Sequence, residues 1–264
     1  MQQSNAYIIT FSVILTVVLG FLLSGTSQLL GPIQQKAVEL DTKKQILGAV
    51  MPGEELNRMD SEGVIDFYER RIASKVVNID GEIVEQDADG NPLIAENVSI
   101  ARNFKRDPAD RLYPVFIYHA EGDENNVESY VLPVYGNGLW DEIWGYVALQ
   151  TDLNTIEGVT FSHAGETPGL GARITSGDVQ ARFQGKEIFN EQGSLESVRF
   201  QKGEGKDYSG DPHKVDGISG STITAEGVNR MLQSYLSHYE NFISRQRGGG
   251  SEPSQEEQEP VALN

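Results

Sequence analysis

Residues 216–243 read DGISGSTITAEGVNRMLQSYLSHYENFI, a glycine- and hydroxyl-rich segment that runs into the clearest helical pattern of the chain. Ser221 or Thr224 can cap the first turn, and Gly217 and Gly220 let the backbone approach a ligand closely. Because helix N-termini favour anions, a phosphate joined to a hydroxyl here would lie in a favourable field. An ordinary glycine turn with a helix cap explains the same residues equally well. The helix itself is predicted from apolar residues at helical spacing: Val228, Met231, Leu232, Tyr235, Leu236, Tyr239, Phe242 and Ile243.

The residues before this segment predict short strands, so the fold class expected for the soluble region is mixed α+β. The predicted strands are Tyr113–Tyr118, which pairs with Ser129–Val134, then Trp144–Gln150, Gly158–Phe161 and Val198–Gln201. Further upstream, residues 34–50 and 64–72 have helical patterns. Asp80-Gly81 and Asp89-Gly90 are hairpin signals within a region of short β-like runs.

The N-terminal region contains an uncharged run, YIITFSVILTVVLGFLL at 7–23, which later residues can lengthen into a membrane anchor at 7–30. A cleaved signal peptide is the alternative. Residues 1–6 carry no Lys or Arg, and no A-x-A site follows the run, so we expect a retained single-pass anchor. Three lysines follow it and none precedes it, which by itself would leave the large domain in the cytoplasm.

The composition restricts the possible chemistry. The formal net charge of −18 makes nucleic acid an unexpected partner. The chain has no cysteine, and its four histidines show no metal-binding spacing, so we expect no metal site and an organic cofactor for any redox chemistry. The predicted organisation is a short segment at 1–6, the anchor at 7–30, a helix-containing part at 31–110, a domain at 111–245 and a disordered acidic tail at 246–264.

Two further segments place glycines and polar residues where a plain core would not need them. In 163–173 (HAGETPGLGAR), Pro168-Gly169 indicates a turn. Glu166 could pair with Arg173 there, or Arg173 could bind a phosphate. In 135–140 (YGNGLW), the last two residues could line a slot for a flat ring, although aromatic packing alone favours burial in the core.

Common catalytic and nucleotide-binding motifs are absent from the sequence. The Gly-x-Gly pairs at 136–138 and 203–205 lack the third glycine of a dinucleotide fingerprint. The chain has no Walker A lysine motif. Residues 217–220 do not form G-x-S-x-G, which disfavours a serine hydrolase.

Taken together, the three segments resemble a known family. DGISGST at 216–222 is similar to the D-G-x-[ST]-G-[AS]-T signature of proteins that receive FMN through a phosphoester to threonine. ETPGLG at 166–171 resembles the other hallmark of that FMN-binding domain. With G-x-G-L-W at 136–140 and the anchor, the chain resembles C subunits of the sodium-translocating NADH:quinone reductase over residues 5–245, most weakly at 75–110. Ser221 departs from the alanine that is usual in the family and adds a second possible acceptor.

The resemblance implies a covalent FMN on Thr222, which a dedicated flavin transferase would load from FAD with magnesium. Ser219, Gly220 and Ser221 would frame the phosphate, and Asp216 would lie in the stretch that the transferase reads. The residues expected beside the flavin are Thr167, Leu170, Gly171 and Trp140.

The resemblance also implies the role and location of the chain. It would relay electrons toward quinone within a complex of other membrane subunits and would not oxidise NADH alone. The flavin domain would lie in the periplasm, anchored in the inner membrane, against the weak lysine bias. Three alternatives remain: the G subunit of an Rnf-type complex, an anchored binding module without redox activity, and a hydrolase. The hydrolase would have to use Ser219 or Ser221 with His163 or His213.

Overall fold

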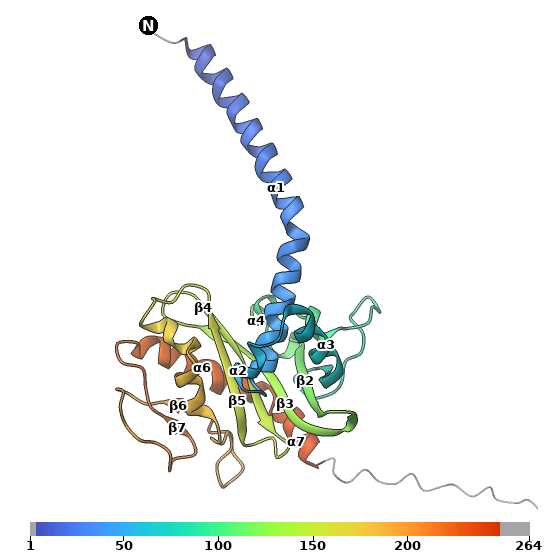
Figure 1. Cartoon of the computed structure of the whole chain (residues 1–264), viewed down its shortest axis with the longest axis vertical. Helices are drawn as coiled ribbons and strands as arrows, with labels where there is room; N and C mark the ends of the chain where they lie inside the picture. The colour runs from blue at the N-terminus through green and yellow to red at the C-terminus, as the bar shows by residue number, and fades with distance from the viewer. Residues whose placement is uncertain (1–3, 249–264) are drawn as a thin grey trace, which may run out of the picture. The chain divides into compact units, whose positions relative to one another are not determined.

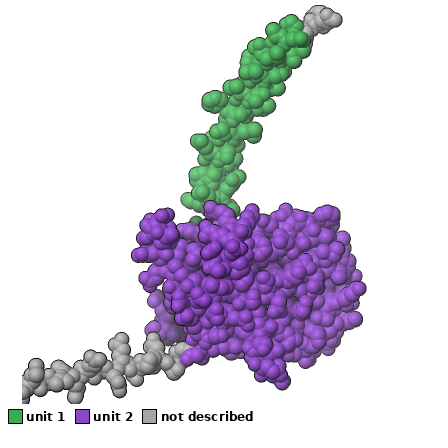
Figure 2. Space-filling model, turned by 180° about the vertical axis from the view of Figure 1, so that it is seen from behind, with its two compact units in different colours: residues 1–44 green, residues 45–264 purple. Residues whose placement is uncertain are grey.

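The structure is a computed structural model that describes residues 4–248. The chain forms two compact units, Met1–Lys44 and Gln45–Asn264, which are coloured green and purple in Figure 2. Residues 246–248, which we assigned to the tail, complete the last helix, α7 (Glu240–Gly248). The rest of the predicted tail lies outside the described residues.

The first unit is part of one long helix, α1 (Asn5–Gly48). The predicted anchor and the predicted helix at 34–50 therefore form one helix, with Pro32 inside it. Within residues 4–248, α1 is the one helix that is long and apolar enough to cross a membrane. Its large apolar side chains are exposed from Tyr7 to Val38. An apolar N-terminal helix followed by an α+β domain is the architecture that the sequence predicts.

The second unit is built on a five-stranded antiparallel sheet in which each strand pairs with the next (Figure 1). The strands are β1 (Ile72–Val77), β2 (Tyr113–Ala120), β3 (Asp123–Asn137), β4 (Glu142–Gln150) and β5 (Ile156–His163). The predicted pairing of the first two strands is confirmed, because Phe116 lies opposite Val131. β1 starts directly after helix α3 (Ser61–Arg71), so strand pairing unites residues on both sides of the predicted boundary at 110/111.

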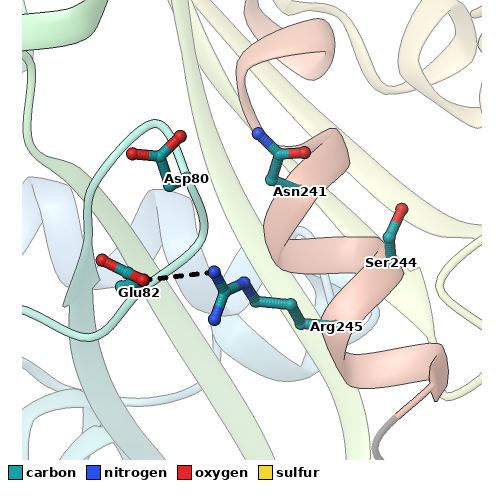
Figure 3. A pocket seen from close by; sticks show the side chains of 5 residues that line it. All are labelled: Asp80, Glu82, Asn241, Ser244 and Arg245. Carbon is teal, nitrogen blue, oxygen red and sulfur yellow. Dashed lines mark hydrogen bonds and ion pairs between the residues drawn. The ribbon is translucent and has the colours of Figure 1, made fainter.

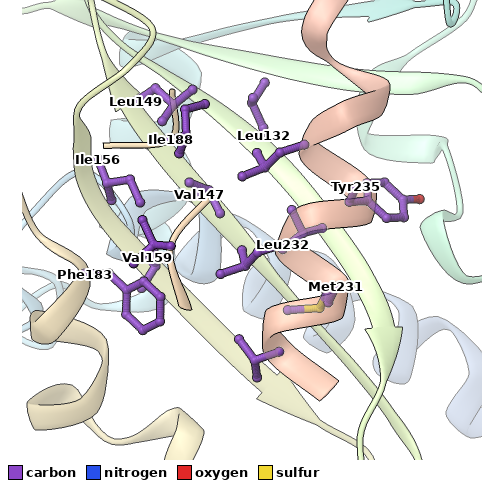
Figure 4. Packing of buried hydrophobic residues seen from close by; sticks show 14 of the residues in the cluster. Leu132, Val147, Leu149, Ile156, Val159, Phe183, Ile188, Met231, Leu232 and Tyr235 are labelled. Carbon is purple, nitrogen blue, oxygen red and sulfur yellow. The ribbon is translucent and has the colours of Figure 1, made fainter. Parts of the chain in front are cut away.

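The two faces of the sheet carry different partners. Val159 and Phe161 of β5 belong to the main core, together with Leu232 of helix α6 (Thr222–His238) (Figure 4). The residue between them, Thr160, points to the other face. Its hydroxyl donates to the carbonyl oxygen of Gln45 at 2.9 Å. α6 thus packs on one face of the sheet, and the last turn of α1 contacts the other face.

Short elements complete the described part of the chain. They are α2 (Gly53–Leu56), α4 (Ile100–Phe104), α5 (Gly177–Gln180), the 3-10 turns η1 (Ala95–Asn97), η2 (Pro108–Asp110), η3 (Gly171–Thr175) and η4 (Ala181–Phe183), and the parallel pair β6 (Arg199–Phe200) and β7 (Lys214–Val215). The two predicted hairpin turns are present: Gly81 and Gly90 have φ values of 75° and 82°, which favour glycine.

The last predicted helix is interrupted. α6 ends at His238 and α7 begins at Glu240, although apolar spacing predicts one helix through Ile243. Tyr239, between them, is fully buried, and its hydroxyl donates to the carbonyl oxygen of Pro114 in β2 at 2.9 Å. The break thus coincides with a long-range contact that local periodicity does not encode.

Candidate functional site

Glu166 brings together the three segments that the sequence analysis identified. One carboxylate oxygen, Oε1, accepts hydrogen bonds from the backbone amides of Leu139 at 2.7 Å and Trp140 at 3.0 Å. The other, Oε2, accepts from the hydroxyl of Thr224 in α6 at 2.6 Å. The side chain is buried, with 4% exposure of the residue. The possible pairing of Glu166 with Arg173 is not present: the neutral donors contact Glu166, and Arg173 pairs with Glu204.

Glycines allow the three segments to approach this closely. A Cβ added to Gly171 would overlap the Glu166 carboxylate and would lie 2.6 Å from Oγ1 of Thr224. A Cβ on Gly227 of α6 would lie 2.6 Å from the carbonyl oxygen of Asn137. Gly171 is therefore a point of close packing between the segments.

The surroundings of Glu166 favour its ionised form. Burial acts to raise the pKa of Glu166, but hydrogen bonds from Thr224 and from the amides of Trp140 and Leu139 outweigh burial. The pKa consequently lies below its ordinary value. At neutral pH the site contains a buried carboxylate anion.

A second carboxylate, Glu204, holds the glycine loop before α6 from its other side. Arg173 donates two hydrogen bonds to it, at 2.6 and 3.0 Å, and Arg182 donates a third at 3.2 Å. The backbone amide of Ser219 donates a fourth at 2.9 Å. The hydrogen bonds from Arg173, followed by the one from the Ser219 amide, lower the pKa of Glu204 to about 2.

Asp216 stabilises the same loop rather than facing solvent freely. Its carboxylate accepts from the amides of Gly205 at 2.7 Å and Lys206 at 3.1 Å. Arg182 donates to the carbonyl oxygens of Asp216 and Gly217, at 3.1 and 2.6 Å. The prediction that Gly217 makes room for a ligand is wrong, because a Cβ there would collide with the carbonyl oxygen of Gln201. Gly217 packs against the chain's own loop.

The hydroxyl-bearing residues at the start of α6 differ in their exposure to solvent. Thr222 and Ser219 are exposed, whereas Ser221 and Thr224 are 4% and 1% exposed. Ser221 occupies the N-cap position, but its side chain makes no capping hydrogen bond, and Thr224 turns to Glu166. Neither residue caps the helix as predicted. The buried hydroxyl of Ser221 has no hydrogen-bond partner within residues 4–248.

Gly220 and Thr167 lie in the two loops beside the start of α6. Gly220 has φ +74°, a conformation that favours glycine, and a Cβ there would lie 2.8 Å from Cδ2 of Leu170. The carbonyl oxygen of Thr167 accepts from the amides of Leu170 and Ala172, at 3.1 and 3.2 Å. The ETPGLG turn thus lies directly against the glycine loop.

Exposed apolar side chains surround this point. Among the described residues of the second unit, six large apolar side chains are exposed, and four of them belong to the three segments. These four are Leu139 (43%), Trp140 (70%), Leu170 (43%) and Ile223 (56%). The expectation that Trp140 is buried in the core is therefore wrong. Such a surface suits a flat, largely apolar ring.

Two other features do not form a catalytic centre. Within residues 4–248, no hydrogen bond joins Ser219 or Ser221 to a histidine; Nδ1 of His163 accepts instead from the amide of Glu166 at 3.2 Å. A pocket of about 470 Å³ lies between the turn at 78–82 and α7 (Figure 3). Its lining combines acidic, amide, hydroxyl and guanidinium groups that belong to none of the three segments: Asp80, Glu82, Asn241, Ser244 and Arg245.

Comparison with known proteins agrees with this geometry. Residues 138–237, which contain all of the Glu166 contacts, match the model of the FMN-binding domain family. The chain is 33% identical over 250 residues to the C subunit of the Na(+)-translocating NADH-quinone reductase of Yersinia pestis, covering 90% of this chain and 91% of that protein. The chain belongs to this family of C subunits. It is an electron-transfer flavoprotein, and FMN is the cofactor of its domain.

Further family members support the assignment. The C subunit of the same reductase from Haemophilus ducreyi is 31% identical over 248 residues, covering 88% of this chain and 90% of that one. The crystal structure of the C subunit from Parabacteroides distasonis superposes with a TM-score of 0.67 at 35% identity, over 81% of this chain and 97% of that chain. The structure of Shewanella oneidensis NqrC gives 0.65 at 28% identity, over 80% and 99%. The resemblance to C subunits found in the sequence is thus confirmed.

The residues present fit an FMN group. The exposed rim offers apolar surface for the ring, and the uncapped first turn of α6 offers amides for the phosphate. The unpartnered hydroxyl of Ser221 is a further donor beside that turn. Two residues that sequence reasoning missed, Glu204 and Arg182, secure the loop. A glutamate between two glycines, in the sequence GEG at 203–205, was the available signal.

Proposed function

We propose that Thr222 carries FMN through a phosphoester and that the chain relays electrons toward quinone inside a sodium-translocating complex. The exposure of the hydroxyls is the observation that carries this proposal. Thr222 is open to solvent on the first turn of α6, whereas Ser221 and Thr224 are buried beside it. A flavin transferase, acting with FAD and magnesium, could therefore reach Thr222 but neither of its hydroxyl neighbours in the helix.

The chain's own residues would bind and orient the group. Ser219, Gly220 and Ser221 would surround the phosphate, and the rim containing Leu170 and Trp140 would contact the ring. Bound FMN supplies one- and two-electron redox chemistry, while the protein supplies position and electrostatics. Glu166 and Glu204 would keep the contact segments in place without touching the acceptor hydroxyl.

The test is transfer to the purified protein. We expect incubation with a flavin transferase, FAD and magnesium to add one FMN, seen as an intact-mass increase and as flavin fluorescence that survives denaturing electrophoresis. Thr222→Ala should abolish both signals, and Ser219→Ala and Ser221→Ala should keep them. A label that persists in Thr222→Ala and disappears in Ser219→Ala would show that the acceptor is the other exposed hydroxyl.

The relay proposal rests on the family and on the missing dinucleotide fingerprint. Partner subunits of the complex would deliver electrons from NADH and remove them. With the flavin-loaded protein under anaerobic conditions, dithionite should bleach the flavin absorbance and NADH should leave it unchanged. Rapid bleaching by NADH would instead identify a self-sufficient dehydrogenase.

The proposed location is the inner membrane, with α1 as the anchor and the flavin domain in the periplasm. The exposed apolar length of α1 supports membrane insertion, and the family supports the orientation. An alkaline phosphatase fused after Asn264 should be active. An inactive fusion, together with an active cytoplasmic reporter at the same point, would show that Lys36, Lys43 and Lys44 set the orientation.

A further inference from the structure

Glu166 is a buried carboxylate that has no cationic partner. Within residues 4–248, no lysine, arginine or histidine forms an ion pair with it. Its donors are two backbone amides and the hydroxyl of Thr224. The arginines of the site, Arg173 and Arg182, bind Glu204, Asp178 and the loop at 216–217 instead. The charge of Glu166 is therefore solvated by neutral dipoles and not cancelled.

The carboxylate lies next to the first turn of α6. Thr224, its hydroxyl partner, is the third residue of the helix, and Thr222 is the first. A helix N-terminus carries a positive partial charge. A buried anion beside this turn offsets that charge, so the field at Thr222 is less positive than a bare helix end would produce. The influence of the Glu166 charge on this turn persists in salt solution, because the carboxylate is buried and buried charges are weakly screened.

We propose that Glu166 lowers the reduction potential of the flavin by placing a fixed negative charge beside the first turn of α6; this inference rests on the proposed attachment at Thr222 in that turn. An electron that enters a flavin without a proton adds one negative charge to it. A nearby fixed anion opposes that addition and favours the oxidised form. Glu166 thus has two roles: its hydrogen bonds hold the contact segments in position, and its charge acts on the reduction potential of the flavin.

Glutamine at position 166 separates charge from shape. Glu166→Gln retains an oxygen for the two amides and a polar group for Thr224, while the charge is lost. With the covalently loaded protein at pH 8, an anaerobic titration against reference dyes should show a higher midpoint potential than in the unsubstituted protein. We expect about a tenfold change in the equilibrium constant for electron uptake, which is about 59 mV for a one-electron couple.

Asp141 provides the matched control, because it lies with Leu139 and Trp140 in the loop between β3 and β4 but is exposed. Asp141→Asn removes an equal charge, yet solvent and salt should screen its effect. Its shift in potential should be much smaller and should vanish at high salt, whereas the Glu166→Gln shift should persist. Equal shifts in the two variants, or an unchanged potential in loaded Glu166→Gln, would overturn the inference.

Thr224→Val provides a second variant for the same measurement of midpoint potential if Glu166→Gln does not accept the flavin. This substitution removes one donor from the carboxylate and leaves its charge less compensated. The potential should therefore fall below that of the unsubstituted protein, and a rise or no change would contradict the inference. Failure of the proposed attachment would look different, because the unsubstituted protein would then carry no covalent flavin.

Discussion

Two carboxylates hold the glycine loop and the start of α6, and they do so by different physical means. Glu166 is buried and accepts from neutral donors, with no counter-ion in the described part of the chain. Glu204 has a side chain that is 23% exposed, and two arginines contact it at 2.6 and 3.2 Å. The first places an uncompensated charge inside the domain, and the second belongs to a charge network near its surface.

This difference in burial and in hydrogen-bond donors indicates different roles for the two carboxylates, which their positions in the sequence do not distinguish. A buried anion is tolerated only where hydrogen bonds replace its hydration, so removing it leaves its donors without an acceptor. A partly exposed ion pair adds little to stability, because water and salt compete with it. Glu166 should therefore contribute more to folding, and Glu204 mainly to the geometry of the loop.

The largest expected effect comes from deleting the buried acceptor. Glu166→Ala leaves the hydroxyl of Thr224 and two amides without their partner, and we expect it to lower the free energy of unfolding by roughly 3 kcal/mol. Urea denaturation measures this change. Glu191→Ala, at an exposed position, is the control and should be nearly neutral. If Glu166→Ala lowered the free energy of unfolding by less than Glu204→Ala does, the conclusion that Glu166 contributes more to folding would be wrong.

A second, intermediate effect should follow from crowding the same contact. In Gly171→Ala the new methyl group would overlap the Glu166 carboxylate and approach Thr224, which should destabilise the domain by roughly 1–3 kcal/mol. Gly177→Ala offers a matched control, since no atom lies within 4 Å of its added Cβ. Thermal unfolding of both proteins checks the prediction. Equal stabilities would mean that the three segments pack less tightly than the structure indicates.

The smallest effect concerns Glu204 and depends on pH. Hydrogen bonds from Arg173 and the Ser219 amide lower its pKa from 4.5 to about 2, so its contribution is present above pH 4.5 and is lost as pH falls toward 2. At neutral pH, Glu204→Gln should cost about 1 kcal/mol or less. The stability gap between the two proteins should close between pH 4.5 and 2, as urea midpoints would show. A gap independent of pH would indicate that charge is not involved.

Much of the fold follows from local patterns in the sequence. The largely apolar runs at 113–118 and 144–150 become β2 and β4, and the Asp-Gly pairs become turns with positive φ. The one-residue break between α6 and α7 does not follow from these patterns. It lies at Tyr239, whose hydroxyl contacts Pro114 on β2, more than a hundred residues earlier in the chain. Spacing along the chain carries no information about such a contact.

The candidate site shows the same division. Glycine and hydroxyl content correctly identified three segments that meet, but not which atoms join them. The sequence allows Glu166 to pair with Arg173, whereas in the structure Glu166 contacts Thr224 and Arg173 contacts Glu204. Packing alone favours a core position for Trp140, because aromatic side chains are mostly buried, yet Trp140 is 70% exposed. The hydrogen-bond partners of Glu166 and Arg173 depend on the three-dimensional arrangement of the segments, which a sequence motif does not specify.

The topology also sets an order of events during synthesis. The five-stranded meander is complete at His163, whereas α6 begins only at Thr222. A chain that emerges N-terminus first therefore presents its sheet some seconds before the helix that covers it. Until then Gly136 and its apolar neighbours on β3 lack the partner that Met231 later provides. The surface around Thr222 consequently forms only when α6 packs against the sheet, so a chain that presents this surface already has its sheet and helix together.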